Sequence, residues 1–214
     1  MRAAIPPYLR SLWNLNAPLY DIAPPHASQP FLSPLGMHLP LAAPEGSSAR
    51  WFEAAAAHAA THLVFSRHRF DATRVGPVTQ AVLGVLEDAR VEWLACRELP
   101  GLRRLWLPFH AEARSDTPDF EALLRRLARC LLDPGCVDPH PWVRKARRLF
   151  FLDEAGDTLA MPQAASLLHA ASLLGNDIGQ MRLQFNARLY RVAPGYRDDN
   201  SYLWHADPTR ADSL

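Results

Sequence analysis

The sequence predicts an all-α protein, a single helical domain that follows an extended, proline-rich N-terminal arm. After residue 48, apolar residues recur at the three- and four-residue spacing of buried helix faces, and strand-like alternation is weak except at residues 188–192. The helical segments also begin and end at residues that favour helix caps and helix stops. We therefore expect an arm at residues 1–48, a helical domain at 49–205 and a tail or the start of a linker at 206–214.

The N-terminal arm is defined by its composition. Residues 1–48 are rich in proline and short of helical periodicity, and pairs such as Pro24-Pro25 interrupt regular structure because proline has no amide donor. We expect this segment to lie extended over the helical body. Its expected anchors are large apolar side chains: Trp13, Tyr20, Phe31 and Leu39.

The next two helices are expected at about residues 48–66 and 78–98. Ser48 can cap the first helix, and a glycine–proline pair lies in the loop that follows it. Apolar residues cover most sides of the second helix, which predicts a central position in the fold. A proline–glycine pair ends this helix, and residues 102–109 are expected to form one more helical turn or a connector.

Four further helices are expected in the second half of the chain. Thr117-Pro118-Asp119 favours a helix start, because it combines capping side chains with a proline in the first turn, and an Asp-Pro-Gly triplet ends that helix. Another helix follows Pro141. The last two are expected at about residues 162–174, ending at Gly175, and at about residues 177–190.

The composition indicates an ordinary globular protein. Of the 214 residues, 49% are hydrophobic, and the formal net charge of +1 gives no reason to expect nucleic acid as the main partner. No apolar run is long enough to span a membrane, and the first residues lack the apolar core of a signal peptide. The three cysteines lack metal-type spacing, so we expect reduced thiols in a cytoplasmic protein.

Two histidines and an acidic cluster form the candidate site. His58 and His62 lie four residues apart on the apolar stripe of one helix, and Glu87 follows on the next helix. This layout resembles the ligand set of zinc peptidases that carry H-E-x-x-H on a helix and a distant third carboxylate. The sequence therefore predicts His58, His62 and Glu87 as zinc ligands, but Ala59 replaces the glutamate that activates water in those enzymes.

A structural interpretation of the same residues stays open. The second helix is so apolar that its charged residues cannot all be solvated, and buried charges are normally paired. Asp88, Arg90 and Glu92 would then form an internal ion-pair network with the histidines, in which Asp88 serves as an outer or alternative metal ligand. A hydrolase that uses the histidines and Glu87 is the third alternative, and Ala59 argues against it.

Two polar surfaces are candidates for binding a partner. One is an arginine-rich helix surface, and the other is a helix whose polar residues alternate with core residues. An ordinary solvated helix face is the alternative for each, and it is the favoured interpretation of the arginine-rich surface. Their residues are Arg144, Arg147 and Arg148 in the first, and Asn176, Asp177 and Gln180 in the second.

Several motifs, in order, resemble the N-terminal region of NorD-type proteins. They are Ala57-His-Ala-Ala-Thr-His-Leu63, Leu86-Glu-Asp-Ala-Arg-Val-Glu92, Leu99-Pro-Gly-Leu-Arg-Arg-Leu-Trp106, Gly175-Asn-Asp-Ile-Gly-Gln-Met-Arg182 and Tyr196-Arg-Asp-Asp-Asn200. Members of that family carry a C-terminal von Willebrand factor A domain, which this sequence does not include.

The resemblance implies a partner and a role. NorD-type proteins work with a MoxR-type AAA+ ATPase to activate nitric oxide reductase in denitrification, and the related CbbO proteins do so for rubisco. The resemblance therefore implies that this protein is a non-enzymatic adaptor that works with such an ATPase on nitric oxide reductase. The alternatives are an adaptor for rubisco and a metal-dependent hydrolase.

Overall fold

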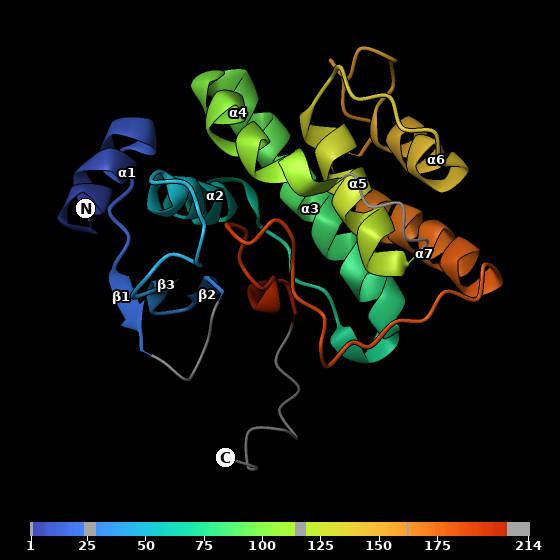
Figure 1. The fold of residues 1–214 in the computed structure, drawn as a ribbon, viewed down its shortest axis with the longest axis horizontal. Coiled ribbons are helices and arrows are strands. Elements are labelled where there is room, and N and C mark those ends of the chain that lie inside the picture. The colour runs from blue at the N-terminus through green and yellow to red at the C-terminus, as the bar shows by residue number, and fades with distance from the viewer. Residues whose placement is uncertain (1, 24–28, 114–118, 162, 205–214) are drawn as a thin grey trace.

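The computed structural model describes residues 2–23, 29–113, 119–161 and 163–204 (Figure 1). Helix α3 lies at the centre with α5 and α7 beside it, while α1, α2 and a small sheet form the other end of the molecule. No helix within the described ranges is long and apolar enough to cross a membrane. The described α-helices are α1 (Ile5–Trp13), α2 (Trp51–Phe65), α3 (Pro77–Glu98), α4 (Gly101–Trp106), α5 (Phe120–Leu132), α6 (Pro141–Phe150) and α7 (Ala164–Gln180).

The prediction of an all-α fold is wrong, because a three-stranded mixed sheet accompanies the helices. Its order is β1 (Leu19–Ile22), β3 (Gly36–Pro40) and β2 (Phe31–Ser33), with β1 parallel and β2 antiparallel to β3. The strands are only three to five residues long, and β3 is buried on both faces, so it shows no apolar–polar alternation. Gly36 begins β3 at a φ of +148°, and a Cβ there would lie 2.4 Å from the Pro18 carbonyl oxygen.

The described part of this segment, residues 2–23 and 29–48, is therefore not an extended arm, while Pro24-Pro25 lies outside the described residues. The described part carries α1 and the sheet, and α1 packs on α2 through the buried side chains of Ile5 and Leu9. Of the predicted anchors, Leu39 is fully buried, whereas Tyr20 is 41% exposed. Trp13, another predicted anchor, does contact the helical domain. Its indole N–H donates a hydrogen bond of 2.9 Å to a Glu98 carboxylate oxygen at the end of α3.

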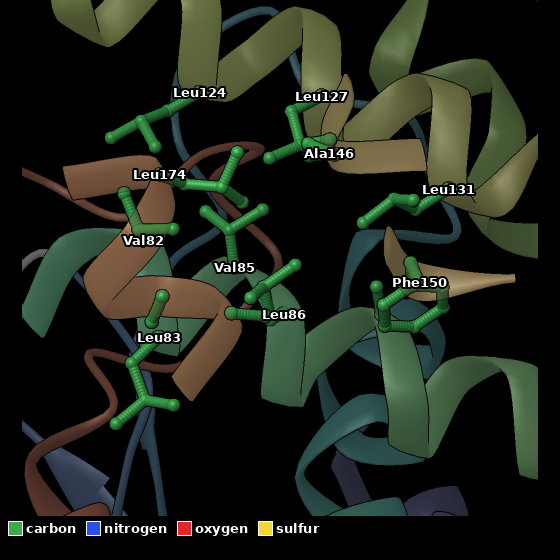
Figure 2. Packing of buried hydrophobic residues seen from close by; sticks show 14 of the residues in the cluster. Val82, Leu83, Val85, Leu86, Leu124, Leu127, Leu131, Ala146, Phe150 and Leu174 are labelled. Carbon is green, nitrogen blue, oxygen red and sulfur yellow. The ribbon is translucent and has the colours of Figure 1, made fainter. Parts of the chain in front are cut away.

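The central position predicted for the second helix is confirmed. Helix α3 buries 14 of its 22 residues, and its apolar side chains pack against α5, α6 and α7 (Figure 2). Val82, Val85 and Leu86 face Leu127 and Leu174 in this cluster. Because α3 is covered on several sides, polar side chains along it must also find partners inside the protein.

The helix predicted at residues 162–174 continues to residue 180, and the separate helix predicted at 177–190 is absent. Helix α7 runs through Gly175 to Gln180, and residues 181–200 contain no helix or strand. Gly175 does not stop the helix; a Cβ there would lie 2.6 Å from Oγ1 of Thr79, so the glycine lets α7 pack closely on α3. The weak strand signal at residues 188–192 is likewise not a strand.

The helix starts follow the sequence more closely. The Asp119 carboxylate accepts a hydrogen bond of 2.5 Å from the Ala122 amide at the start of α5, while the predicted positions 117 and 118 fall outside the described residues. Helix α2 begins three residues after Ser48, whose carbonyl accepts from the Trp51 amide. A capping side chain thus begins α5, whereas α2 begins after Arg50 without a side-chain cap, so the cap predicted at Ser48 does not form.

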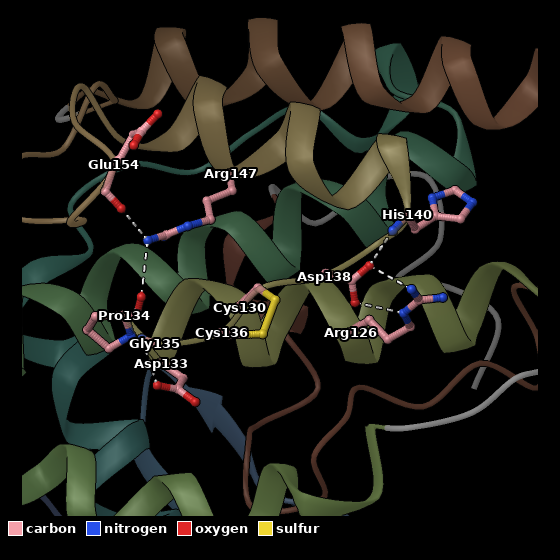
Figure 3. The surroundings of a disulfide bond; sticks show 10 residues. All are labelled: Arg126, Cys130, Asp133, Pro134, Gly135, Cys136, Asp138, His140, Arg147 and Glu154. Carbon is pink, nitrogen blue, oxygen red and sulfur yellow. Dashed lines mark hydrogen bonds and ion pairs between the residues drawn. A yellow bond between two sulfur atoms is a disulfide. The ribbon is translucent and has the colours of Figure 1, made fainter.

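The expectation of three reduced thiols is wrong for two of them. Cys130 in α5 and Cys136 form a disulfide across the Asp133-Pro134-Gly135 turn, with their Cα atoms 5.0 Å apart (Figure 3). The turn is held by the Asp133 carboxylate, which accepts from the Gly135 amide at 3.0 Å. Arg126 also forms a two-point ion pair with Asp138 beside the disulfide, at 2.6 and 2.8 Å. Cys96 is buried and free, and burial raises the pKa of its thiol to about 12.

Candidate metal centre

The two histidines of α2 point into the interior, as their spacing predicts. His58 exposes 0% and His62 exposes 2% of its surface. Their Nε2 atoms lie 3.2 Å apart, which places one imidazole nitrogen in hydrogen-bond distance of the other. A hydrogen bond between two such nitrogens requires one of them to lack its proton. Alanines surround both residues along α2, so the helix approaches its neighbours closely.

Helix α3 places a carboxylate at the paired imidazoles. Asp88 Oδ1 lies 3.4 Å from His62 Nε2 and 3.8 Å from His58 Nε2, and Asp88 is fully buried. No described residue offers this oxygen a well-aligned hydrogen-bond donor. One donor atom from each of the three residues lies within 4.8 Å of the other two, so the triad could hold a metal ion.

Glu87, the carboxylate predicted as a ligand, lies next to this triad rather than in it. Its two oxygens accept from the Nε and Nη2 atoms of Arg90, each at 2.7 Å. The Ser66 hydroxyl also donates to Glu87 Oε1 at 2.5 Å. Arg90 extends a further hydrogen bond of 3.0 Å to the Phe65 carbonyl at the end of α2. Glu87 and Arg90 therefore join α3 to α2 at the edge of the site.

The second ring nitrogen of His62 has its own partners. Its Nδ1 lies 3.0 Å from the Ser66 hydroxyl and also contacts the Tyr202 hydroxyl at a short distance. Since Ser66 in turn donates to Glu87, a chain of hydrogen bonds runs from the ring to the Glu87–Arg90 pair. These contacts orient the imidazole so that Nε2 points toward His58 and Asp88.

His58 is oriented in the same way by a carboxylate. Its Nδ1 lies 3.0 Å from Oε1 of Glu92, one helical turn beyond Asp88 on α3. Glu92 also accepts a hydrogen bond of 2.8 Å from the Tyr196 hydroxyl. A histidine whose Nδ1 is held by a carboxylate presents its Nε2 as a ligand with increased basicity. His62 thus has one ring nitrogen hydrogen-bonded, His58 has one in ion-pair contact with Glu92 without an aligned hydrogen bond, and both direct Nε2 into the site.

Residues 196–200 also contribute to the site, which was not predicted from the sequence. Arg197 is fully buried and pairs with Glu92 at 2.6 and 3.1 Å, and its Nη1 lies 3.5 Å from Asp88 Oδ2. Asp198 Oδ2 lies 3.8 Å from His58 Nε2 and 3.6 Å from His62 Nε2. The signal available in the sequence was the dense run Arg-Asp-Asp-Asn between two tyrosines, which also fits a solvated loop.

The electrostatics of the site divide its carboxylates into two kinds. Burial tends to raise the pKa of Glu92, but Arg197 and His58 outweigh it and hold that pKa well below the usual range. Burial raises the pKa of Asp198, and the nearby histidines oppose this only in part. Burial tends to lower the pKa of His62, whereas Asp198 and Asp88 together raise it above its ordinary value.

The buried charges do not balance among themselves. Asp88, Glu92 and Asp198 carry three negative charges when ionised, Arg197 carries one positive charge, and neutral histidines add none, which leaves −3 + 1 = −2. Each uncompensated charge buried in a protein interior costs on the order of several kcal/mol of folding free energy. The site therefore requires about two protons or one divalent cation.

The predicted partner-binding residues lie on two neighbouring helices, away from the metal site. Arg144 and Arg148 are exposed on α6, and Arg147 donates to the carbonyl oxygens of Glu154 and Pro134 (Figure 3). Asn176 and Gln180 are exposed near the end of α7, and Asp177 forms an ion pair of 2.7 Å with Lys145 of α6.

Comparison with protein-family models, with curated protein sequences and with solved structures finds no match to this chain. The geometry of the site therefore carries the functional argument.

Proposed function

We propose that His58, His62 and Asp88 hold a structural divalent metal ion, with zinc as the expected ion, inside a non-catalytic protein-binding domain. The observation that carries this proposal is the pair of Nε2 atoms, which face each other 3.2 Å apart in a buried place. Two nitrogen ligands about 2.0–2.1 Å from a tetrahedral zinc ion lie about 3.3–3.4 Å apart. The imidazoles thus already have the spacing of a zinc-binding pair.

The donor atoms favour zinc over the hard cations. Magnesium and calcium prefer oxygen ligands, whereas two imidazole nitrogens with a carboxylate suit zinc and its neighbours in the first transition row. The Nδ1 of His58 beside Glu92 matches the carboxylate–histidine–zinc arrangement that is common around such ions. A bound cation would also remove the need for a proton between the two Nε2 atoms.

The burial of the ligands supports a structural role rather than hydrolysis. A catalytic zinc keeps a position open for water or substrate and needs a general base nearby. The ligands here expose 2% of their surface or less, and Ala59 stands where the related peptidase pattern carries its base. Glu87, another acid close to His62, is already held by Arg90 and Ser66.

Metal analysis tests this proposal directly. The wild-type chain, stripped of metal and then dialysed against zinc, is expected to retain about one ion per chain and to melt at a higher temperature than the stripped form. His58→Ala and His62→Ala are expected to lose both effects. His169→Ala, which removes an exposed histidine of α7, serves as the matched control and should behave like wild type. A wild-type chain that retains no divalent ion would refute the metal site.

The partner class rests on the resemblance to NorD-type proteins. In that interpretation the domain is an adaptor that binds a MoxR-type AAA+ ATPase and helps to activate nitric oxide reductase, with rubisco as the alternative client. A surface pocket on α6 supports a protein contact, because exposed Arg144 and Arg148 line it together with exposed Val137 and Leu152. Asp138, Asp153 and Glu154 line the same pocket, so its charge is mixed, and the two exposed arginines beside apolar side chains are the part of it that suits an acidic partner segment.

Co-purification with the ATPase tests the adaptor role. Wild type is expected to bind in at least one nucleotide state, and the double variant Arg144→Glu/Arg148→Glu is expected to bind at least tenfold more weakly. Arg188→Glu, at an exposed arginine outside α6, is the control for charge reversal. Absence of binding in every nucleotide state would favour a passive structural module. Zinc-dependent peptide cleavage that is lost in His58→Ala would instead favour the hydrolase.

A further inference from the structure

Asp198 stands out among the buried polar groups because only one of its two carboxylate oxygens is satisfied: Oδ1 accepts a hydrogen bond of 2.8 Å from the Asn200 amide. It exposes 0% of its surface, yet its Oδ2 has no hydrogen-bond donor among the described residues. Asp198 lies in a segment without helix or strand, about 100 residues after α3 in the sequence. A buried carboxylate oxygen without a partner is costly, so a role for it must be sought in what it faces.

Asp198 Oδ2 faces the same two atoms as Asp88 Oδ1. It lies 3.8 Å from His58 Nε2 and 3.6 Å from His62 Nε2, while Asp88 Oδ1 lies 3.8 and 3.4 Å from them. Asp88 Oδ1 likewise lacks a well-aligned donor. Two imidazole nitrogens and two unpartnered carboxylate oxygens therefore point into one buried place, from three separate parts of the chain.

Charge in this arrangement requires compensation, by protons or by a cation. Arg197 is committed to Glu92 by two hydrogen bonds and reaches Asp88 only through Nη1 at 3.5 Å. No described arginine or lysine forms an ion pair with Asp198. Its charge therefore adds to that of Asp88 in the same low-dielectric place. A divalent cation between the two carboxylates would turn this repulsion into attraction.

We propose that Asp198 is the fourth ligand of the metal ion, and that the ion thereby fastens residues 195–200 over the site. This inference rests on the metal site proposed above. The other three ligands come from α2 and α3, so those two helices can hold the ion before residues 195–200 close. Asp198 then completes the site, and Tyr196 and Arg197 reach Glu92 beside it. The ion links the C-terminal segment to the helical core.

The isosteric variant Asp198→Asn tests the proposal, with Asp199→Asn as its control. Asp199 is the adjacent acid, but it is exposed, and its carboxylate accepts a hydrogen bond from the Ser201 amide while its own amide donates to the Pro30 carbonyl. Zinc affinity is measured by competition with a chelator. We expect Asp198→Asn to weaken zinc binding by about 10- to 100-fold or more, because even the loss of an outer partner of a ligand costs that much. Asp199→Asn is expected to bind zinc as wild type does.

Hydrogen exchange then separates the ligand role from a general loss of structure. In wild type, zinc is expected to slow amide exchange both in α2 and in residues 195–203. In Asp198→Asn at saturating zinc, protection is expected to persist in α2 and to disappear from residues 195–203. Without metal at pH 8, Asp198→Asn is expected to melt at a higher temperature than wild type, because it removes one unbalanced buried charge.

Each outcome separates the two proposals. Equal zinc affinity and equal protection of residues 195–203 in wild type and Asp198→Asn would refute the fourth ligand while leaving the metal site intact. Failure of wild type to bind zinc, cobalt or another divalent ion would refute both. A metal-free Asp198→Asn variant that melts at a lower temperature than wild type would also contradict the role of Asp198 as an uncompensated charge.

Discussion

Replacement of Arg197 with methionine should destabilise the protein strongly, because it leaves the buried carboxylate of Glu92 without its counter-ion. Both side chains are fully buried and joined by two hydrogen bonds, at 2.6 and 3.1 Å. Breaking such a pair by removing one partner costs about 3–5 kcal/mol. Methionine fills much of the aliphatic volume, so little of this loss comes from an empty cavity. For a domain of this size, the expected fall in melting temperature is about 6–20 °C.

The assay is thermal unfolding of the metal-free protein at pH 7, followed by circular dichroism. Arg50→Met is the matched control, since Arg50 pairs with Glu53 at 2.7 Å but with 61% of its side chain exposed, and such pairs contribute at most about 1 kcal/mol. The double variant Arg197→Met/Glu92→Gln should recover part of the loss, because it removes the unpaired charge. Similar shifts for Arg197→Met and Arg50→Met would refute the reasoning that the pair is buried and desolvated.

Three further predictions test separate parts of the structure. Glu87→Ala and Arg90→Ala should each lower the free energy of unfolding by about 2–5 kcal/mol in urea titrations, because each leaves a buried charge unpaired. Losses as small as those caused by substitutions of surface residues would mean that the Glu87–Arg90 pair is solvated. The pKa of His110 is lowered from 6.5 to about 3, mainly by burial, so the unfolded chain binds more protons between those values. Stability should therefore fall as pH drops from 7 toward 3, by at most about 1.4 kcal/mol per pH unit from this group, and His110→Gln should flatten that slope. Gly175→Ala should cost about 1–3 kcal/mol, because its Cβ would lie 2.6 Å from Oγ1 of Thr79, and adding Thr79→Ala should restore part of it.

Local sequence signals located most helices and the face of the paired histidines. Helix α3 was expected at residues 78–98 and spans Pro77–Glu98, and the Asp119 cap begins α5. The i, i+4 spacing of His58 and His62 was sufficient to put both on one buried face. Caps and periodicity depend only on residues within one or two turns, so a single sequence contains them.

The choice between Glu87 and Asp88 could not be made from the sequence. Both residues are buried, at 4% and 0% exposure, because α3 is covered on several sides. Periodicity shows that a helix is enclosed but not which buried residue faces which neighbour. That depends on how α3 crosses α2, and the crossing is decided by packing. The same limit applies to Gly175, which reads as a helix stop until Thr79 is seen against it.

The sequence by itself determined a mainly helical protein in which two inward-facing histidines lie beside an apolar helix that carries several acidic residues. Only the tertiary structure decided that a short sheet is present, and that Arg197 and Asp198 enter the site. Arg197 contacts Glu92 across 105 positions of the chain, and its segment has neither helix nor strand to give it a periodic signature. Such contacts arise because buried charges must find partners wherever the fold brings them, and no local pattern records that requirement.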